Sequence, residues 1–347
     1  MNFTSDNAGP VPAAVLDALA RANAGHAPGY GADELSERVR DRIRTLFEAP
    51  NAAVELVSTG TAANSLALAT LCQPFQTVFC SPVAHIHEDE CNAPEFYTGG
   101  AKLTLVPGAD KMTAEGLRAT IAAEESRGVH GPQRGPVSIT QITERGNLYT
   151  LDELHALSAV ARDYDLPVHL DGARFANACV ALECTPAEMT WKAGVDVAVF
   201  GGTKNGCMGV EAVIFFDPAK HWEFQLRRKR GGHLFSKFRY LAAQMDAYLE
   251  GDLWRELAGM ANARCAALAA GLTGVADIRN VPQGNMLFAA LPRRAHRALH
   301  EAGARYYMWE GELDGHDDSE MLTARLVCDW SVTEADIARF VEIAKGA

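Results

Sequence analysis

Three short segments of the chain place reactive side chains beside small residues. In GGTKN (201–205) the lysine Lys204 follows an apolar run, and in HLDGAR (169–174) the acid Asp171 follows another. The third segment, TGTAAN (59–64), consists mostly of small residues and leads into an apolar helical pattern. In open α/β sheets, ligands bind beyond the carboxyl ends of the strands, so we expect the three segments to meet at one sheet edge.

Each segment predicts one part of a binding site. TGTAAN lets an anion such as a phosphate approach the N-terminus of a helix, although an ordinary helix capped by Thr61 has the same pattern. A buried Lys204 would have a lowered pKa and would attack an aldehyde, and the glycines beside it leave room for a ligand. Asp171 either keeps a pyridine nitrogen protonated or simply pairs with Arg174. Phosphate, aldehyde and pyridine together describe pyridoxal phosphate, which we expect as the cofactor.

The elements that must position these residues alternate along the first two-thirds of the chain. Short apolar strand patterns are separated by amphipathic helical patterns, and this alternation predicts an α/β fold with a mainly parallel sheet covered by helices. The run 235–272 has a helical pattern over many turns, and the residues after it predict a smaller sheet with two helices. We therefore expect a large domain at 1–245, including an N-terminal arm, and a small C-terminal α/β domain at 246–347.

These motifs, together with AHIH at 84–87, resemble the fold-type I pyridoxal phosphate enzymes and, among them, the L-threonine aldolase family. The resemblance extends from FTSDN near the N-terminus to ARLVCDW near the C-terminus, and HLDGAR with a lysine 33 residues after its aspartate is its most specific part. It implies that Lys204 binds the cofactor covalently and that Asp171 pairs with the pyridine nitrogen. The other implied cofactor contacts are Gly60, Thr61, Ala62 and Thr203 at the phosphate, His85 over the ring, Arg174 at the phenolate oxygen, and Lys229.

The resemblance also implies how a substrate would be held. Its carboxylate suits the planar fork of arginine, and three residues would bind it: Ser5, Arg174 and Arg325. Tyr30 would line the entrance to the site. Many family members have a histidine at the position of Glu144, and some have an aspartate near that of Asp89, so we expect both acids near the substrate β-hydroxyl. His85 would move protons there, either directly or through a water held by Asp89 or Glu144.

The implied reaction is the cleavage of L-threonine, L-allo-threonine or related L-β-hydroxy-α-amino acids to glycine and an aldehyde. The same scaffold also supports β-eliminating lyases and amino-acid racemases, which form pyruvate and ammonia or the opposite enantiomer. A non-catalytic binding protein with this fold is a further alternative, although the presence of Lys204, Asp171 and Arg325 argues against it.

Net charge narrows the range of macromolecular partners. The chain carries a net charge of −12, which argues against binding to nucleic acid in spite of the basic run 227–230. That run is either a solvated helix face or, as the family implies for Lys229, a contact with the cofactor phosphate of a neighbouring subunit. The second interpretation implies a homotetramer, built as a dimer of dimers with shared active sites.

The remaining titratable residues predict neither a metal site nor a membrane protein. The eight cysteines lack the spacing of zinc ligands, and we expect them to be reduced, buried thiols. The acidic segment HIHEDE (85–90) continues past His85 with charges typical of a solvated loop. Neither a signal peptide nor a membrane-spanning run is present, so we expect a cytoplasmic protein without a membrane partner.

Overall fold

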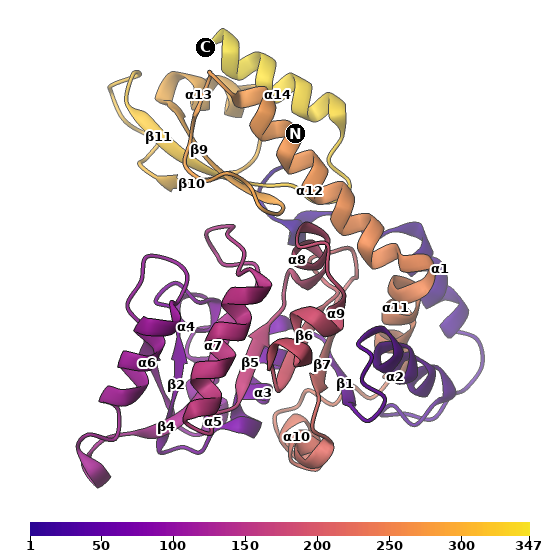
Figure 1. The fold of residues 1–347 in the computed structure, drawn as a ribbon. Helices are drawn as coiled ribbons and strands as arrows, with labels where there is room; N and C mark the ends of the chain where they lie inside the picture. The colour runs from indigo at the N-terminus through magenta and orange to yellow at the C-terminus, as the bar shows by residue number, and fades with distance from the viewer.

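The computed structural model describes residues 1–347, whose strands form two separate sheets (Figure 1). Each sheet has its own hydrophobic core. The larger sheet has seven strands in the order β1-β7-β6-β5-β4-β2-β3. Only β7 runs against its neighbours β1 and β6, so the prediction of a mainly parallel α/β sheet is confirmed. Its strands are β1 (Ala53–Val57), β2 (Gln76–Cys80), β3 (Lys102–Leu105), β4 (Gln133–Thr140), β5 (Val168–Asp171), β6 (Val197–Gly201) and β7 (Glu211–Phe215).

Helices cover both faces of this sheet. Helix α3 (Gly60–Leu71) is buried at every residue from 62 to 70, because it packs against the sheet, α5 (Ala93–Thr98) and α10 (His221–Arg230). Helix α7 (Leu151–Asp163) begins at a capping box. The other helices of this part are α1 (Ala13–Ala22), α2 (Glu34–Leu46), α4 (His85–Glu88), α6 (Ala114–Ala123), α8 (Phe175–Ala181), α9 (Pro186–Met189) and α11 (Arg239–Leu249).

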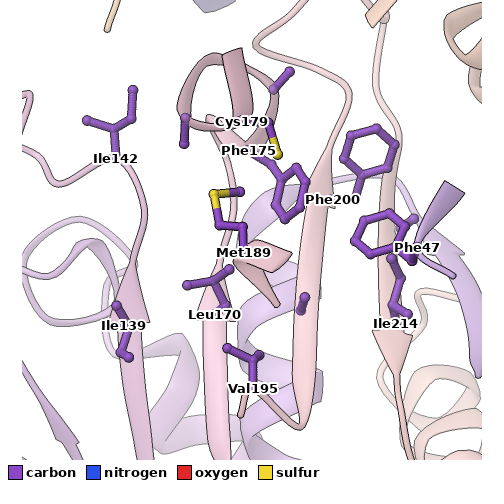
Figure 2. Close-up of a cluster of buried hydrophobic side chains, with 14 of the residues drawn as sticks. Phe47, Ile139, Ile142, Leu170, Phe175, Cys179, Met189, Val195, Phe200 and Ile214 are labelled. Carbon is purple, nitrogen blue, oxygen red and sulfur yellow. The ribbon is translucent and has the colours of Figure 1, made fainter. Parts of the chain in front are cut away.

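The central strands are anchored by side chains on both of their faces. All residues of β5 and β6 are buried, which explains the unbroken apolar sequence of β6, whereas β5 also buries His169 and Asp171. Along β6, Val197 and Val199 belong to the cluster around α3, whereas Phe200 belongs to the largest cluster on the other face. The ring of Phe200 lies 5.6 Å from that of Phe47 and 5.3 Å from that of Phe175 (Figure 2). This packing holds the carboxyl ends of the strands in fixed positions.

The second sheet is antiparallel and has the strand order β10-β11-β9-β8. Its core also contains Phe3 from the N-terminal arm, whose ring is 5.2 Å from that of Phe340. The arm therefore leaves the small core before the chain enters the large sheet. The elements of this part are β8 (Asp277–Ile278), β9 (Met286–Pro292), β10 (Tyr307–Glu310), β11 (Met321–Val327), α12 (Leu253–Leu272), α13 (Arg293–Glu301) and α14 (Glu334–Gly346).

The helical run expected at 235–272 is two helices, α11 and α12, rather than one. Gly251 and Asp252 separate them with φ values of 59° and 58°. Glycine adopts this left-handed conformation readily, so the chain changes direction here. Helix α12 then packs against α8 of the large part and against α14 of the small part. None of the helices combines the length and hydrophobicity that a membrane crossing requires.

Candidate active site

Five of the predicted site residues lie at or just beyond the ends of five parallel strands of the large sheet. Gly60 starts α3 after β1, His85 starts α4 after β2, Glu144 follows β4, Asp171 ends β5 and Lys204 follows β6. The charges of Lys204 and Asp171 both act on the pKa of His85, and the charge of Lys204 also acts on the pKa of Glu144. Residues that are far apart in the sequence therefore form one electrostatically coupled cluster.

Asp171 is buried, and its carboxylate is only half satisfied. Oδ1 accepts a hydrogen bond from the N–H of Ala173 at 3.0 Å, while Oδ2 is buried without a partner. A buried carboxylate oxygen without a donor is costly, so Oδ2 fits a ligand N–H such as that of a protonated pyridine. Asp171 does not form an ion pair with Arg174, because the guanidinium group of Arg174 binds Asp6 instead.

Lys204 lies in the turn after β6 and is half-buried rather than fully buried. The glycines before it accommodate the backbone of neighbouring strands, which corrects the expectation that they leave room for a ligand. A Cβ on Gly201 would lie 2.7 Å from the carbonyl oxygen of Gly172, and one on Gly202 would lie 2.8 Å from that of Val210. Such close packing of the strand ends fixes the start of the turn that carries Lys204.

The first turn of α3 is open, as an anion site requires. Thr59, and not Thr61, caps the helix, since its Oγ1 accepts a hydrogen bond from the N–H of Ala62 at 3.2 Å. A Cβ on Gly60 would meet no atom within 4 Å. The N–H groups of Gly60 and Thr61, in the first turn, have no acceptor within the helix, so they suit a phosphate.

The hydroxyl group of Thr203 is already engaged in the turn after β6. It accepts a hydrogen bond from the N–H of Val210 at 3.1 Å and lies against the buried carboxyl group of Glu211. Burial raises the pKa of Glu211 to about 7, although Thr203 and the N–H of Gly202 oppose this rise. Thr203 therefore stabilises the turn that carries Lys204.

His85, Asp89 and Glu144 form a polar cluster. Nδ1 of His85 is 3.3 Å from Oε1 of Glu144 and 3.6 Å from Oδ2 of Asp89, but neither contact has hydrogen-bond geometry. The Glu144 carboxylate raises the pKa of His85 against the effect of burial. Burial opposes ionisation of Glu144, but His85, Arg174 and Lys204 outweigh it and lower its pKa to about 2. The three clustered side chains also place possible metal ligands within 4.8 Å of one another, a grouping that the sequence did not predict.

Arg174, which we expected at the substrate carboxylate, is bound by a carboxylate of the chain itself. Its Nε donates to Oδ2 of Asp6 at 2.7 Å, and its Nη2 donates to Oδ1 at 3.1 Å. Both side chains are buried, and Asn285 of the small part donates a third hydrogen bond to Asp6 at 3.0 Å. Ser5, next to Asp6, accepts a hydrogen bond from the N–H of Asn7 at 3.1 Å. The sequence did not reveal the role of Asp6, because no local pattern links positions 6 and 174.

Arg325, in contrast, does not bind a carboxylate. It lies half-buried on β11, and its Nη2 contacts Sδ of Met286 at 3.9 Å. Burial and the nearby Arg174 lower the pKa of Arg325. A partly desolvated guanidinium group without a bound anion suits the carboxylate of a ligand.

A cavity of about 520 Å³ lies between the large part and the small sheet. It is lined by Phe288, which is opposite Arg325 in the small sheet, and by Arg145, which follows Glu144. Trp309 lies there at 5.1 Å from Phe288 in an edge-to-face arrangement. Another groove, about 640 Å³, is lined mostly by residues of α2, with Leu249, Asp252 and Trp254 near the start of α12. Neither this groove nor the cavity beside Phe288 is lined by a predicted site residue itself.

Tyr30 and Lys229 contact each other. Nζ of Lys229 is 5.1 Å from the ring centroid of Tyr30, which is 53% exposed. The basic run is not a solvated helix face throughout, because Arg228 is buried and forms an ion pair with Glu55 at 2.7 Å. Burial opposes ionisation of Glu55, but His221 and Arg228 outweigh it and lower the pKa of Glu55 to about 2.

A mainly parallel sheet with its site at the strand ends and a small C-terminal sheet beside it is the architecture of the fold-type I pyridoxal phosphate enzymes. The unpartnered oxygen of Asp171 and the open start of α3 fit the pyridine and phosphate groups of that cofactor. The family model for beta-eliminating lyases matches residues 2–304.

Two bacterial proteins and one solved structure are similar to almost the whole chain. The chain is 42% identical to the low specificity L-threonine aldolase of Pseudomonas aeruginosa, over 99% of this chain and 96% of that protein. It is 41% identical to the protein of the same name from Pseudomonas sp. strain NCIMB 10558, over 96% and 94% of the two chains. The threonine aldolase of Leishmania major superposes with a TM-score of 0.92 and 29% identity, covering 99% of this chain and 98% of that one. The chain belongs to the beta-eliminating lyase family and, within it, to the low specificity L-threonine aldolases, which are pyridoxal phosphate-dependent aldehyde-lyases.

Proposed function

We propose that this chain cleaves L-threonine, L-allo-threonine or related L-β-hydroxy-α-amino acids to glycine and an aldehyde. The observation that carries this proposal is the unpartnered Oδ2 of Asp171 in one cluster with Lys204 and His85. The near full-length similarity to two low specificity L-threonine aldolases supports the choice of reaction.

In this proposal, Lys204 binds pyridoxal phosphate covalently and Asp171 accepts the hydrogen bond of its pyridine N–H. His85 would lie over the ring, and Thr203 would hold the turn that carries Lys204. When bound, the cofactor accepts the electrons released as the Cα–Cβ bond of the substrate breaks. The residues that bind its phosphate are Gly60, Thr61 and Ala62, with Lys229 supplied by a neighbouring subunit.

Arg325 is the main group for the substrate carboxylate, and Ser5 assists it. Asp6 balances the charge of Arg174 but occupies only some of its N–H donors. The remaining donors of Arg174 bind the substrate carboxylate and the cofactor phenolate. Fixing the carboxylate orients the Cα–Cβ bond for cleavage, and such orientation supplies much of the rate enhancement.

Neutral His85 accepts the proton of the β-hydroxyl group, directly or through a water held by Asp89. The Glu144 carboxylate, 3.3 Å away, then stabilises the imidazolium that forms. The Cα–Cβ bond breaks, the aldehyde leaves, and a proton is delivered to Cα to complete glycine. The cavity between the two parts receives the substituent on Cβ, and its volume of about 520 Å³ does not restrict that substituent to a methyl group.

We further propose a cytoplasmic homotetramer, a dimer of dimers, in which Tyr30 and Lys229 complete the active site of a neighbouring subunit. The exposed Tyr30–Lys229 pair supports this arrangement. So do two exposed apolar side chains of α10, the helix of Lys229: Trp222 is 68% exposed and Leu226 is 52% exposed. All eight cysteines are free thiols, as a reducing compartment favours; seven of them are buried as expected, but Cys91 is exposed. The two separate cores support a large and a small domain, for which we propose 1–245 and 246–347, although Tyr248, Trp254 and Ala258 of the second range still pack in the large core.

The test joins product analysis with a chemical label. Incubation with L-threonine should release glycine and acetaldehyde, whereas pyruvate with ammonia, or the opposite enantiomer, would reveal a β-eliminating lyase or a racemase. Borohydride reduction of the holoenzyme, followed by peptide mass spectrometry, should locate the cofactor on Lys204. Lys204→Ala should lose both the label and turnover, while Lys102→Ala, at an exposed lysine, should keep both. Full turnover by Lys204→Ala would contradict the proposal.

A further inference from the structure

Asn205, the residue after Lys204, is buried and uses both hydrogens of its side-chain amide. Its Nδ2 donates one hydrogen bond to Oη of Tyr248 and another to the carbonyl oxygen of Trp254, each at 2.7 Å. Oη of Tyr248 in turn donates to the carbonyl oxygen of Gly201 at 3.3 Å. Tyr248 therefore bridges the two ends of the turn that carries Lys204.

The two partners of Asn205 lie on consecutive helices, where the large part of the chain meets the small part. Tyr248 is in the last turn of α11 and Trp254 is in the first turn of α12, and both side chains are buried. Gly206, the next residue of the turn, is close to α12, because a Cβ there would lie 3.0 Å from Cδ1 of Leu257. Helix α12 continues into the small core, so Asn205 binds this turn to the helix that connects the two parts.

The other side of the turn is held at the start of β7. The hydroxyl group of Thr203 accepts a hydrogen bond from the N–H of Val210, immediately before that strand. The side chains on both sides of Lys204 are thus engaged, one toward β7 and the other toward α11 and α12. Because a buried donor is costly unless it is bonded, this network favours a single conformation of the turn. It therefore fixes the backbone from which the side chain of Lys204 extends.

We propose that Asn205 is a positioning residue for Lys204, which holds the turn against α11 and α12 so that Nζ meets the aldehyde of pyridoxal phosphate. In that step Nζ attacks the aldehyde carbon, the carbonyl oxygen leaves as water, and a C=N bond remains. A displacement of about 1 Å is enough to slow a step of this kind by about a hundredfold. The inference rests on the cofactor site proposed above.

The rate at which the apoprotein captures the cofactor tests this role without reference to turnover. Apoprotein is mixed with pyridoxal phosphate, samples are reduced with borohydride at timed intervals, and the labelled Lys204 peptide is quantified by mass spectrometry. Asn205→Ala should be labelled at least about tenfold more slowly than wild type. Tyr248→Phe, which keeps the bond from Asn205 to Trp254, should be slowed to a smaller extent.

Pyridoxamine phosphate separates a misplaced lysine from a damaged site, because its amine cannot form a covalent bond with Lys204. Its dissociation constant for Asn205→Ala, from fluorescence titration, should stay within about threefold of wild type. Asn262→Ala is the matched control, since Asn262 is also on α12 but donates its hydrogen bond to the carbonyl oxygen of Asn177 in α8, at 3.0 Å. This control should be labelled at the wild-type rate, and melting temperatures identify any variant that fails to fold.

A folded Asn205→Ala that is labelled at the wild-type rate would overturn the proposal. So would an affinity for pyridoxamine phosphate that falls as far as the labelling rate, or an Asn262→Ala slowed as much as Asn205→Ala. If Asn205→Ala does not fold, Tyr248→Phe decides, and a wild-type labelling rate in that variant overturns the proposal. A wild-type protein labelled at a lysine other than Lys204 would instead contradict the proposed function, so the two failures are distinguishable.

Discussion

Replacing Asp6 with alanine should destabilise the folded chain strongly, because it leaves the guanidinium group of Arg174 buried without its carboxylate. The side chains of Asp6 and Arg174 are only 1% and 3% exposed, and hydrogen bonds of 2.7 and 3.1 Å join them. Removal of one partner from such a buried pair costs about 3–5 kcal/mol. The charges of Glu144 and Asp171 also stabilise the Arg174 cation, so we expect a loss near the lower value, about 3 kcal/mol.

Urea unfolding of the apoprotein at pH 7, followed by circular dichroism and by tryptophan fluorescence, measures this loss. The double variant Asp6→Ala with Arg174→Met should lose less stability than the sum of its parts, with a coupling energy of at least about 1.5 kcal/mol, since neither charge stays buried alone. Asp17→Ala, on the exposed side of α1, is the control and should change stability by about 0.5 kcal/mol or less. A loss below about 1 kcal/mol for Asp6→Ala, or strict additivity in the double variant, would refute the reasoning.

Two other ion pairs predict that the stability of the fold and the rate of the reaction depend on pH. The pKa of Glu55 falls from 4.5 to about 2 on folding. At about 1.4 kcal/mol per pKa unit, ionised Glu55 therefore contributes roughly 3 kcal/mol to the free energy of unfolding above pH 4.5. This contribution is lost as pH falls toward 2. Glu55→Gln should therefore be less stable than wild type at pH 6 and approach it at pH 2 in urea unfolding, and equal stability at pH 6 would contradict this. Glu144→Gln removes the carboxylate that raises the pKa of His85, so the acidic limb of kcat/KM should move to lower pH. An unmoved limb would show that His85 is not the base.

The sequence predicted the placement of the site well because each motif directly follows a strand. Strands of one parallel sheet end at one edge, so His85, Asp171 and Lys204 had to meet once the alternation of strands and helices was recognised. The helix start at TGTAAN was predicted for the same reason, although the cap is Thr59.

Pairings between distant residues could not be predicted in this way. The bond between Asp6 and Arg174 joins positions that share no periodic pattern, and it removes from Arg174 part of the role that its residue type suggests. Glu90 has the same local composition as its exposed neighbours, and only its tertiary contact with Asn64 shows that it is internal. The glycines before Lys204 were misinterpreted because their packing partners, Gly172 and Val210, become neighbours only in the folded sheet.

Helix α12 is a member of both hydrophobic cores, and this has a mechanical consequence. Trp254 near its start packs in the large core and Leu268 packs in the small one, about 21 Å further along at 1.5 Å per residue. The helix therefore acts as a lever, because its first turns are packed on α8 and the large core while its far end lies in the small core. A tilt of about 5° of α12 on the large part displaces the far end by roughly 2 Å, which exceeds the tolerance of a hydrogen bond. In the proposed function, small changes where α12 meets the large core would thus govern how closely Arg325 approaches a substrate held by the large sheet.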